Sequence, residues 1–279
     1  REMDFPASLA YNRWFGSVFG RNNNLLRATG EPADIKALTL ADCLSWHESW
    51  HLGRDFSLCI VGSIEPNMLK ELCVRFFSCS ATDDPHLPQF PEYYRQKAGK
   101  TVQYKHKEQS IVHIGGYACP ASRRSDNSAF HVLAQILGGD LSSRMFSILR
   151  ETHGYAYQTG FDFSSIEDLG FWYAYAFCDP KDHKACLKTS LDILDDLILN
   201  GISTEELKAA QNYLISVNRY DTESVSFRAA TIANLISLGY DLDFYLQREA
   251  RIAATTEEQI HSLAKEWLQP ENRYIHVMV

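Results

Sequence analysis

Apolar residues recur every three to four positions through much of the second half of the chain, a spacing typical of helices that bury one face. One predicted helix carries its apolar positions at Leu187, Leu191, Leu194 and Ile198. Ser203 and Glu206 then match a capping box that opens a second helix. Further helices are predicted at about 223–238, 241–252 and 256–268.

Shorter apolar runs with β-branched and aromatic residues predict strands between and after these helices. They lie at about 101–107, 111–118, 155–163, 170–178 and 273–279. The third and fourth runs are joined by a short polar segment, so we expect an antiparallel hairpin. Because strands and helices are grouped in blocks and do not strictly alternate, the pattern predicts an α+β fold: an antiparallel-rich sheet covered on one face by helices.

The first third of the chain has a different pattern. It is mostly helical, with a helix predicted at about 40–52, another from Pro66 to about Phe77, and one strand over 55–62. A lone strand leaves its backbone groups unpaired, so its partners must lie elsewhere. The domain organisation that follows is 1–82 as the C-terminal part of a first α+β domain, 83–99 as a proline-containing linker, and 100–279 as a complete second domain. We therefore expect the chain to be the later portion of a longer unit.

A helix-to-strand joint near residue 150 is the most informative segment. The adjacent Gly138 and Gly139 permit a tight turn, and Ser142 or Ser143 is placed to cap the helix that follows. Gly154 fits the left-handed position that ends a helix. The apolar face of this helix is expected at Leu141, Met145, Ile148 and Leu149.

Arg150 falls in the last turn of that helix, and Tyr157 falls early in the next strand. The two side chains are therefore expected to lie side by side. A guanidinium and a phenol placed together suit a peptide carbonyl or a tetrahedral oxyanion. The same local pattern also fits an ordinary helix–strand joint with a surface arginine and a packed tyrosine.

Composition and charge narrow the range of partners. The 279 residues carry 27 Lys and Arg against 35 Asp and Glu, a formal net charge of -8, and no basic cluster stands out, which argues against nucleic acid. No apolar run is long enough to cross a bilayer, so we expect a soluble protein without a membrane partner. The seven cysteines are odd in number and scattered, which favours buried free thiols in a reducing compartment, with an organellar or periplasmic location left open.

A second candidate for chemistry is His47-Glu48-Ser-Trp-His51, which matches H-E-x-x-H. On a helix the two histidines would share one face, with Glu48 placed to activate a zinc-bound water. A catalytic zinc needs three protein ligands, and only two are evident. A self-contained zincin using His47, His51 and Glu48 is nevertheless one reading of the sequence.

The order of these motifs resembles the pitrilysin/insulysin family of zinc metallopeptidases, which includes the mitochondrial processing peptidase. The resemblance rests on 38–62, on Gln109-Ser-Ile-Val-His-Ile-Gly-Gly, and above all on 137–157 with its glycine turn, Ser-Ser-Arg, Leu-Arg and Gly-x-Ala-Tyr. It implies a protein made of two halves that close around an extended peptide. One half binds zinc, and the other holds the substrate with an arginine and a tyrosine.

That resemblance assigns substrate binding to Arg150 and Tyr157 and assigns no metal ligand or catalytic residue to this chain. Zinc is expected on the partner half, whether a separate chain or another part of the same polypeptide. The leading hypothesis is the substrate-clamping portion of a zinc metalloendopeptidase that cleaves peptides or unfolded proteins, inactive by itself. Besides the zincin, the alternative is a non-catalytic structural subunit of the same fold.

Overall fold

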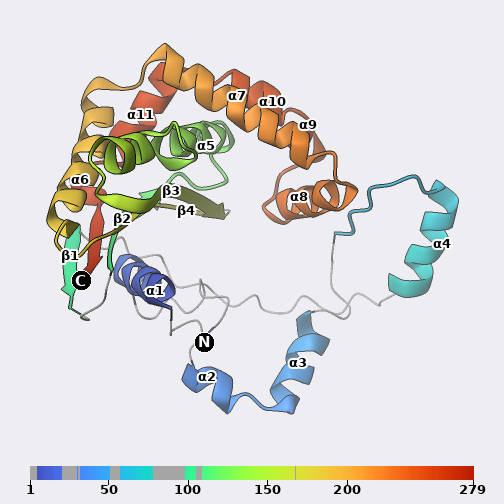
Figure 1. Cartoon of the computed structure of the whole chain (residues 1–279). Helices are drawn as coiled ribbons and strands as arrows, with labels where there is room; N and C mark the ends of the chain where they lie inside the picture. The colour runs from blue at the N-terminus through green and yellow to red at the C-terminus, as the bar shows by residue number, and fades with distance from the viewer. Residues whose placement is uncertain are drawn as a thin grey trace.

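A computed structural model describes residues 5–20, 30, 32–50, 57–77, 98–104, 109–166 and 168–279 of the chain (Figure 1). Four helices come first: α1 (Pro6–Phe19), α2 (Pro32–Ala37), α3 (Leu40–Trp50) and α4 (Pro66–Phe77). The central block is β1 (Gly99–Gln103), β2 (Ser110–Ala118), α5 (Arg124–Gly138), the π-helix η3 (Phe146–Thr152), β3 (Ala156–Ile166) and β4 (Leu169–Cys178). The last block is α6 (His183–Asn200), α7 (Thr204–Asp221), α8 (Val225–Ser237), α9 (Leu242–Leu246), α10 (Arg248–Ala253), α11 (Glu257–Trp267), the 3₁₀ turn η4 (Pro270–Asn272) and β5 (Tyr274–Met278).

The strands form one five-stranded sheet in the order β1-β5-β2-β4-β3. Only the β1–β5 pair is parallel, and the other three pairs are antiparallel. The predicted hairpin is present as β3–β4, with a register irregularity at its start between Ala156 and Gln158. The predicted α+β class with an antiparallel-rich sheet is therefore confirmed.

Helices cover one face of this sheet and form the main core with it. Figure 1 shows α5, α6 and α11 on this side of the strands. Alternate residues of β2 and β4 point into the core, including Val112, Ile114 and the fully buried Trp172. Trp172 stacks on Phe161 with ring centroids 5.2 Å apart and donates from its indole N–H to the Trp267 carbonyl. This layer matches the helices that the 3.6-residue spacing predicts.

Helix α1 covers part of the opposite face, which the one-sided arrangement predicted from the sequence did not include. Trp14 and Phe15 are buried against the intervening residues of the strands, among them Tyr173. The indole N–H of Trp14 donates to the Tyr274 carbonyl at 3.1 Å. The sequence-based prediction missed this second layer. The aromatic residues of α1 lie about one helical turn apart, so they mark a buried helix face, but the local pattern does not show which surface buries it.

The segments α2 to α4 have mostly exposed side chains. The starts of α3 and α4 agree with the sequence, whereas α2 was not predicted. The backbone N–H of Thr39 donates to Asp42, and that of Asp42 donates to the Thr39 hydroxyl, so a capping box opens α3. The strand predicted over 55–62 is wrong for its described part, since 57–62 forms no strand. No described strand pairs with it, and an isolated strand has no partner for its backbone groups.

Two further sequence expectations are changed or narrowed by the structure. The helix predicted at 241–252 is divided at Gln247 into α9 and α10. Among the six described cysteines, Cys119, Cys178 and Cys186 are buried free thiols, whereas Cys43 is exposed. Across the residues that the structure describes, no helix has the length and apolar character needed to span a membrane.

Candidate functional site

The joint between α5 and β3 contains the candidate site, and its turn is held by close packing. A Cβ atom on Gly138 would lie 2.1 Å from the backbone nitrogen of Phe161 in β3. One on Gly139 would lie 2.1 Å from Oε1 of Gln135, and Gly139 itself has ordinary right-handed torsions. Gly138 is therefore required for close approach of α5 to the sheet, whereas Gly139 lies against Gln135 of its own helix, and neither has the positive φ of an unusual turn.

Asp140, rather than either serine, supplies the side-chain cap after this turn. Its Oδ1 accepts from the backbone N–H and the hydroxyl of Ser142, at 2.7 Å each. The Ser143 hydroxyl donates to the Asp140 carbonyl at 2.6 Å. The predicted serine cap is wrong because the Ser143 hydroxyl donates back to Asp140, and the Asp140 carboxylate holds the turn that precedes the helix. Leu141, expected on the apolar face, is 70% exposed, whereas Met145 is fully buried.

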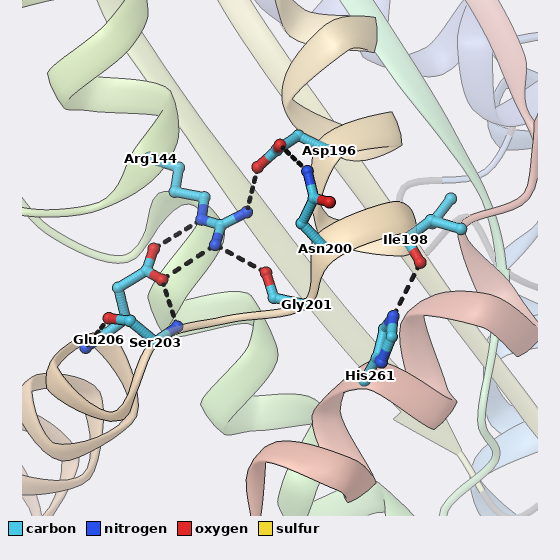
Figure 2. A network of polar contacts seen from close by, with 8 residues as sticks. All are labelled: Arg144, Asp196, Ile198, Asn200, Gly201, Ser203, Glu206 and His261. Atoms are coloured by element: carbon cyan, nitrogen blue, oxygen red, sulfur yellow. Dashed lines mark hydrogen bonds and ion pairs between the residues drawn. The ribbon is translucent and has the colours of Figure 1, made fainter.

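Arg144 anchors the start of the joint to the α6–α7 loop (Figure 2). Its guanidinium donates to both carboxylate oxygens of Glu206, at 2.6 and 2.9 Å, and to the Gly201 carbonyl at 2.8 Å. A third carboxylate contact, to Asp196, is 3.1 Å long. Glu206 also accepts from the backbone N–H of Ser203, completing the capping box that opens α7. One arginine therefore fixes the turn, the end of α6 and the start of α7.

We did not predict this network from the sequence, although the residues at both of its ends belong to recognisable motifs. Arg144 stands within the Ser-Ser-Arg motif, and Glu206 belongs to a correctly predicted capping box. Burial opposes ionisation of Glu206, but the hydrogen bonds from Arg144 and Ser203 outweigh it and lower its pKa. The two residues lie 62 positions apart, so no local spacing links them.

Arg150 and Tyr157 are brought together at the other end of the joint. Arg150 lies in the last turn of the π-helix, which ends at Thr152, and Gly154 follows with a φ of 66°, which confirms the predicted left-handed position. The Arg150 guanidinium donates to the backbone carbonyl of Tyr157 at 2.6 Å and lies 5.0 Å from the ring centroid of Phe146. The Tyr157 side chain is 49% exposed, so it is not the packed tyrosine of an ordinary joint.

This arrangement leaves donors available to a ligand. A guanidinium has five N–H groups in a fixed plane, and the bond to Tyr157 uses one of them. The phenol adds an O–H donor. π-helical turns often occur at functional sites, and here the wider turn places Arg150 directly before the strand that carries Tyr157. The pair can therefore donate hydrogen bonds to a carbonyl or oxyanion presented from solvent.

A tyrosine-lined depression of about 280 Å³ begins at the residue after Tyr157. Gln158 and Asp162 line it from β3, together with Tyr11 of α1 and Tyr173 of β4. Burial and the nearby Asp162 carboxylate raise the pKa of Tyr11 to about 12 and raise that of Tyr173 as well. These phenols stay neutral at physiological pH, so the depression has an aromatic and hydrogen-bonding lining, to which neither Arg150 nor Tyr157 contributes.

The H-E-x-x-H match is only partly described. His47 and Glu48 lie on α3 with exposed side chains, and His51 is outside the described residues. Within the described ranges, no three His, Cys, Asp or Glu side chains are grouped so that they could hold a metal ion. The zincin reading therefore stays a sequence-based prediction, and the described residues do not supply a zinc site.

Solved structures show which class of protein has this fold. The peptidase M16 inactive domain from Pseudomonas fluorescens superposes with a TM-score of 0.85 at 17% identity, covering 99% of this chain and 66% of that one. A protease from Helicobacter pylori gives a TM-score of 0.81 at 19% identity, covering 98% and 66%. The fold is thus that of M16 peptidase domains.

The chain belongs to the peptidase M16 family, because the model described as the peptidase M16 inactive domain matches residues 37–214. The resemblance to the pitrilysin/insulysin metallopeptidases is thereby confirmed. A zinc protease of Streptomyces coelicolor, described as uncharacterized, is 26% identical over 276 residues, or 95% of this chain and 59% of the relative. A non-peptidase homolog of Helicobacter pylori is 26% identical over 150 residues, or 53% and 34%. The chain spans about 60% of the length of the first of these relatives.

Proposed function

We propose that this chain is the substrate-holding portion of a two-half zinc metalloendopeptidase that cleaves peptides or unfolded proteins. The observation that carries the proposal is the guanidinium of Arg150, which is held by the backbone carbonyl of Tyr157, together with the exposure of the Tyr157 side chain. Membership of the M16 family and relatives named as zinc proteases support this choice of reaction.

The role of these residues is to bind and orient the substrate backbone. Arg150 and Tyr157 donate hydrogen bonds to the carbonyl of the scissile peptide and stabilise the negative charge that develops on its oxygen. Because the described residues hold no metal group, zinc and the base that activates water are assigned to the other half. That half is either a separate chain or another part of the same polypeptide.

Replacing Tyr157 with Phe tests the assignment. The variant removes one hydrogen-bond donor, so we expect kcat/KM for peptide cleavage by the assembled enzyme to fall by about 10- to 100-fold. The free energy of unfolding of this chain should stay within about 0.5 kcal/mol, since the side chain is half exposed. Tyr220→Phe is the matched control, because Tyr220 is 76% exposed on α7, away from the joint, and its loss should leave cleavage unchanged. Equal activity of the Tyr157→Phe variant and the wild type would remove the substrate-binding role.

A non-catalytic structural subunit is the second candidate. The similarity to a Helicobacter pylori protein named as a non-peptidase homolog favours it. The two functions differ in a direct assay of the chain assembled with a zinc-bearing M16 half. Peptide hydrolysis that requires both halves and is abolished by a chelator supports the peptidase, whereas hydrolysis by the zinc-bearing half alone, unaltered by this chain, supports the structural role.

A further inference from the structure

A second cavity lies in the helix layer, separate from the Arg–Tyr pair. Its volume is about 360 Å³, which is within the range of small-molecule pockets. It is lined by α5, the end of β3, and residues from α7 through α10. Figure 1 shows α8 beside α9 at the opposite end of the helix layer from α6. Neither Arg150 nor Tyr157 lines this cavity, so it is a distinct feature of the chain.

Cationic and neutral polar groups line the cavity, and no carboxylate does. The two cations are Arg248 and Arg251. Arg251 is held in place: its Nε donates to the Ser128 hydroxyl at 3.2 Å, and its guanidinium lies 3.4 Å from the ring centroid of Phe244. Neutral polar groups are contributed by Asn127, Ser128, His131, Ser164, Ser165, Thr231 and Asn234. The cavity wall therefore presents positive charge and hydrogen-bond donors.

Arg248 is the unexplained member of this set. Its guanidinium makes no hydrogen bond or close ion pair with any described residue. Burial lowers its pKa, and the more distant carboxylate of Asp221 opposes this effect only in part. Arg248 is only partly buried, so its guanidinium donors are open to an anion in the cavity.

The rest of the wall is apolar and supplies a surface for the body of a ligand. Helix α8 contains many apolar residues, yet none of its 13 residues is buried. Leu235 and Leu238 line the cavity from α8, and Phe163 lines it from β3. Tyr240 stacks on Phe244 with ring centroids 4.0 Å apart, giving a flat side to the cavity. A ligand with both an anionic group and an apolar group would contact both kinds of wall.

We propose that this cavity binds a small organic anion, with its carboxylate or phosphate group against Arg248 and Arg251 and its apolar body against α8 and Phe163. Arg251 is fixed by Ser128 and Phe244, while Arg248 turns its donors to the ligand. Guanidinium groups bind both carboxylates and phosphates through paired N–H donors. An experiment therefore has to distinguish a carboxylate ligand from a phosphate ligand.

Isothermal titration calorimetry of the 279-residue chain with phenyl phosphate and with benzoate tests this site. We expect saturable binding of at least one probe with a Kd below about 1 mM, and the tighter of the two identifies the preferred anionic group. Phenol, which lacks the anionic group, should bind at least about tenfold more weakly. Arg248→Gln should weaken binding of the preferred probe at least about tenfold, because it removes the unpaired cation.

Two further variants test the site even if the Arg248→Gln variant does not fold. Thr231→Phe keeps both arginines and fills the cavity from α8, so it should also abolish binding. Lys188→Gln removes an equal charge from the exposed face of α6 and should bind as the wild type does. The proposal is overturned if neither anion binds, if phenol binds as tightly, or if Thr231→Phe binds the probe unchanged.

Discussion

The two ends of the joint between α5 and β3 use the same residue type in opposite ways. Arg144 is 14% exposed, and its guanidinium contacts two carboxylates and a backbone carbonyl within the chain. Arg150, six residues later, is exposed, and its guanidinium donates a hydrogen bond to a single backbone carbonyl, that of Tyr157. An arginine whose donors are satisfied internally fixes a fold, whereas one with free donors at the surface is available to a ligand. Within one short motif, Arg144 therefore stabilises the fold, and Arg150 is available to a ligand.

Exchanging each arginine for glutamine is expected to give the largest contrast. Arg144→Gln leaves the partly buried carboxylate of Glu206 without its cation, so the free energy of unfolding should fall by about 3 kcal/mol. Arg150→Gln should change it by less than about 0.5 kcal/mol while lowering peptide cleavage by the assembled enzyme. Urea denaturation of the two variants measures the difference. Equal destabilisation by both would mean that the division of roles is wrong.

Gly154→Ala is expected to have an intermediate effect, because it acts on the turn that brings Arg150 to Tyr157. The position has a φ of 66°, and a Cβ there would meet no atom within 4 Å, so only the backbone conformation is penalised. We expect a loss of about 1 kcal/mol in the free energy of unfolding. Gly154→Asn should lose less, since asparagine tolerates the left-handed region. A loss for Asn as large as that for Ala would argue against this cause.

The smallest effect concerns pH and again involves Arg144. The pKa of Glu206 is lower in the folded chain than its ordinary value of 4.5. Its stabilising contribution is therefore fully present above that value and is lost as the pH falls through the lowered folded pKa. Glu206→Gln should flatten the fall of stability below pH 4.5, with a modest amplitude because the carboxylate is partly solvated. Identical slopes for the variant and the wild type would show that this pair does not contribute to acid sensitivity.

Features encoded by neighbouring residues were predictable from the sequence. The capping boxes of Thr39 and Ser203, the hairpin β3–β4 and the left-handed Gly154 all depend on contacts within a few positions. The proximity of Arg150 and Tyr157 was predictable for the same reason, since one turn of chain joins them.

Features that depend on distant segments were not predictable. The close approach of Gly138 to Phe161, the bond between Arg144 and Glu206, and the packing of α1 on the sheet join residues far apart in the chain. Neither apolar periodicity nor motif spacing contains those distances. Because these long-range contacts leave no sign in the local pattern, the two glycines were assigned to a tight turn and Leu141 was expected to be buried.

The burial of Trp14 and Phe15 against the sheet determines where this protein can be shortened. A chain cut at the proposed linker, beginning near residue 98, would lose α1 and place the aromatic surface around Phe171 and Tyr173 in water. Exposed apolar patches of this kind promote aggregation. The smallest fragment that stays in solution is therefore expected to include α1 together with the sheet. That fragment is longer than the segment of chain that supplies the strands.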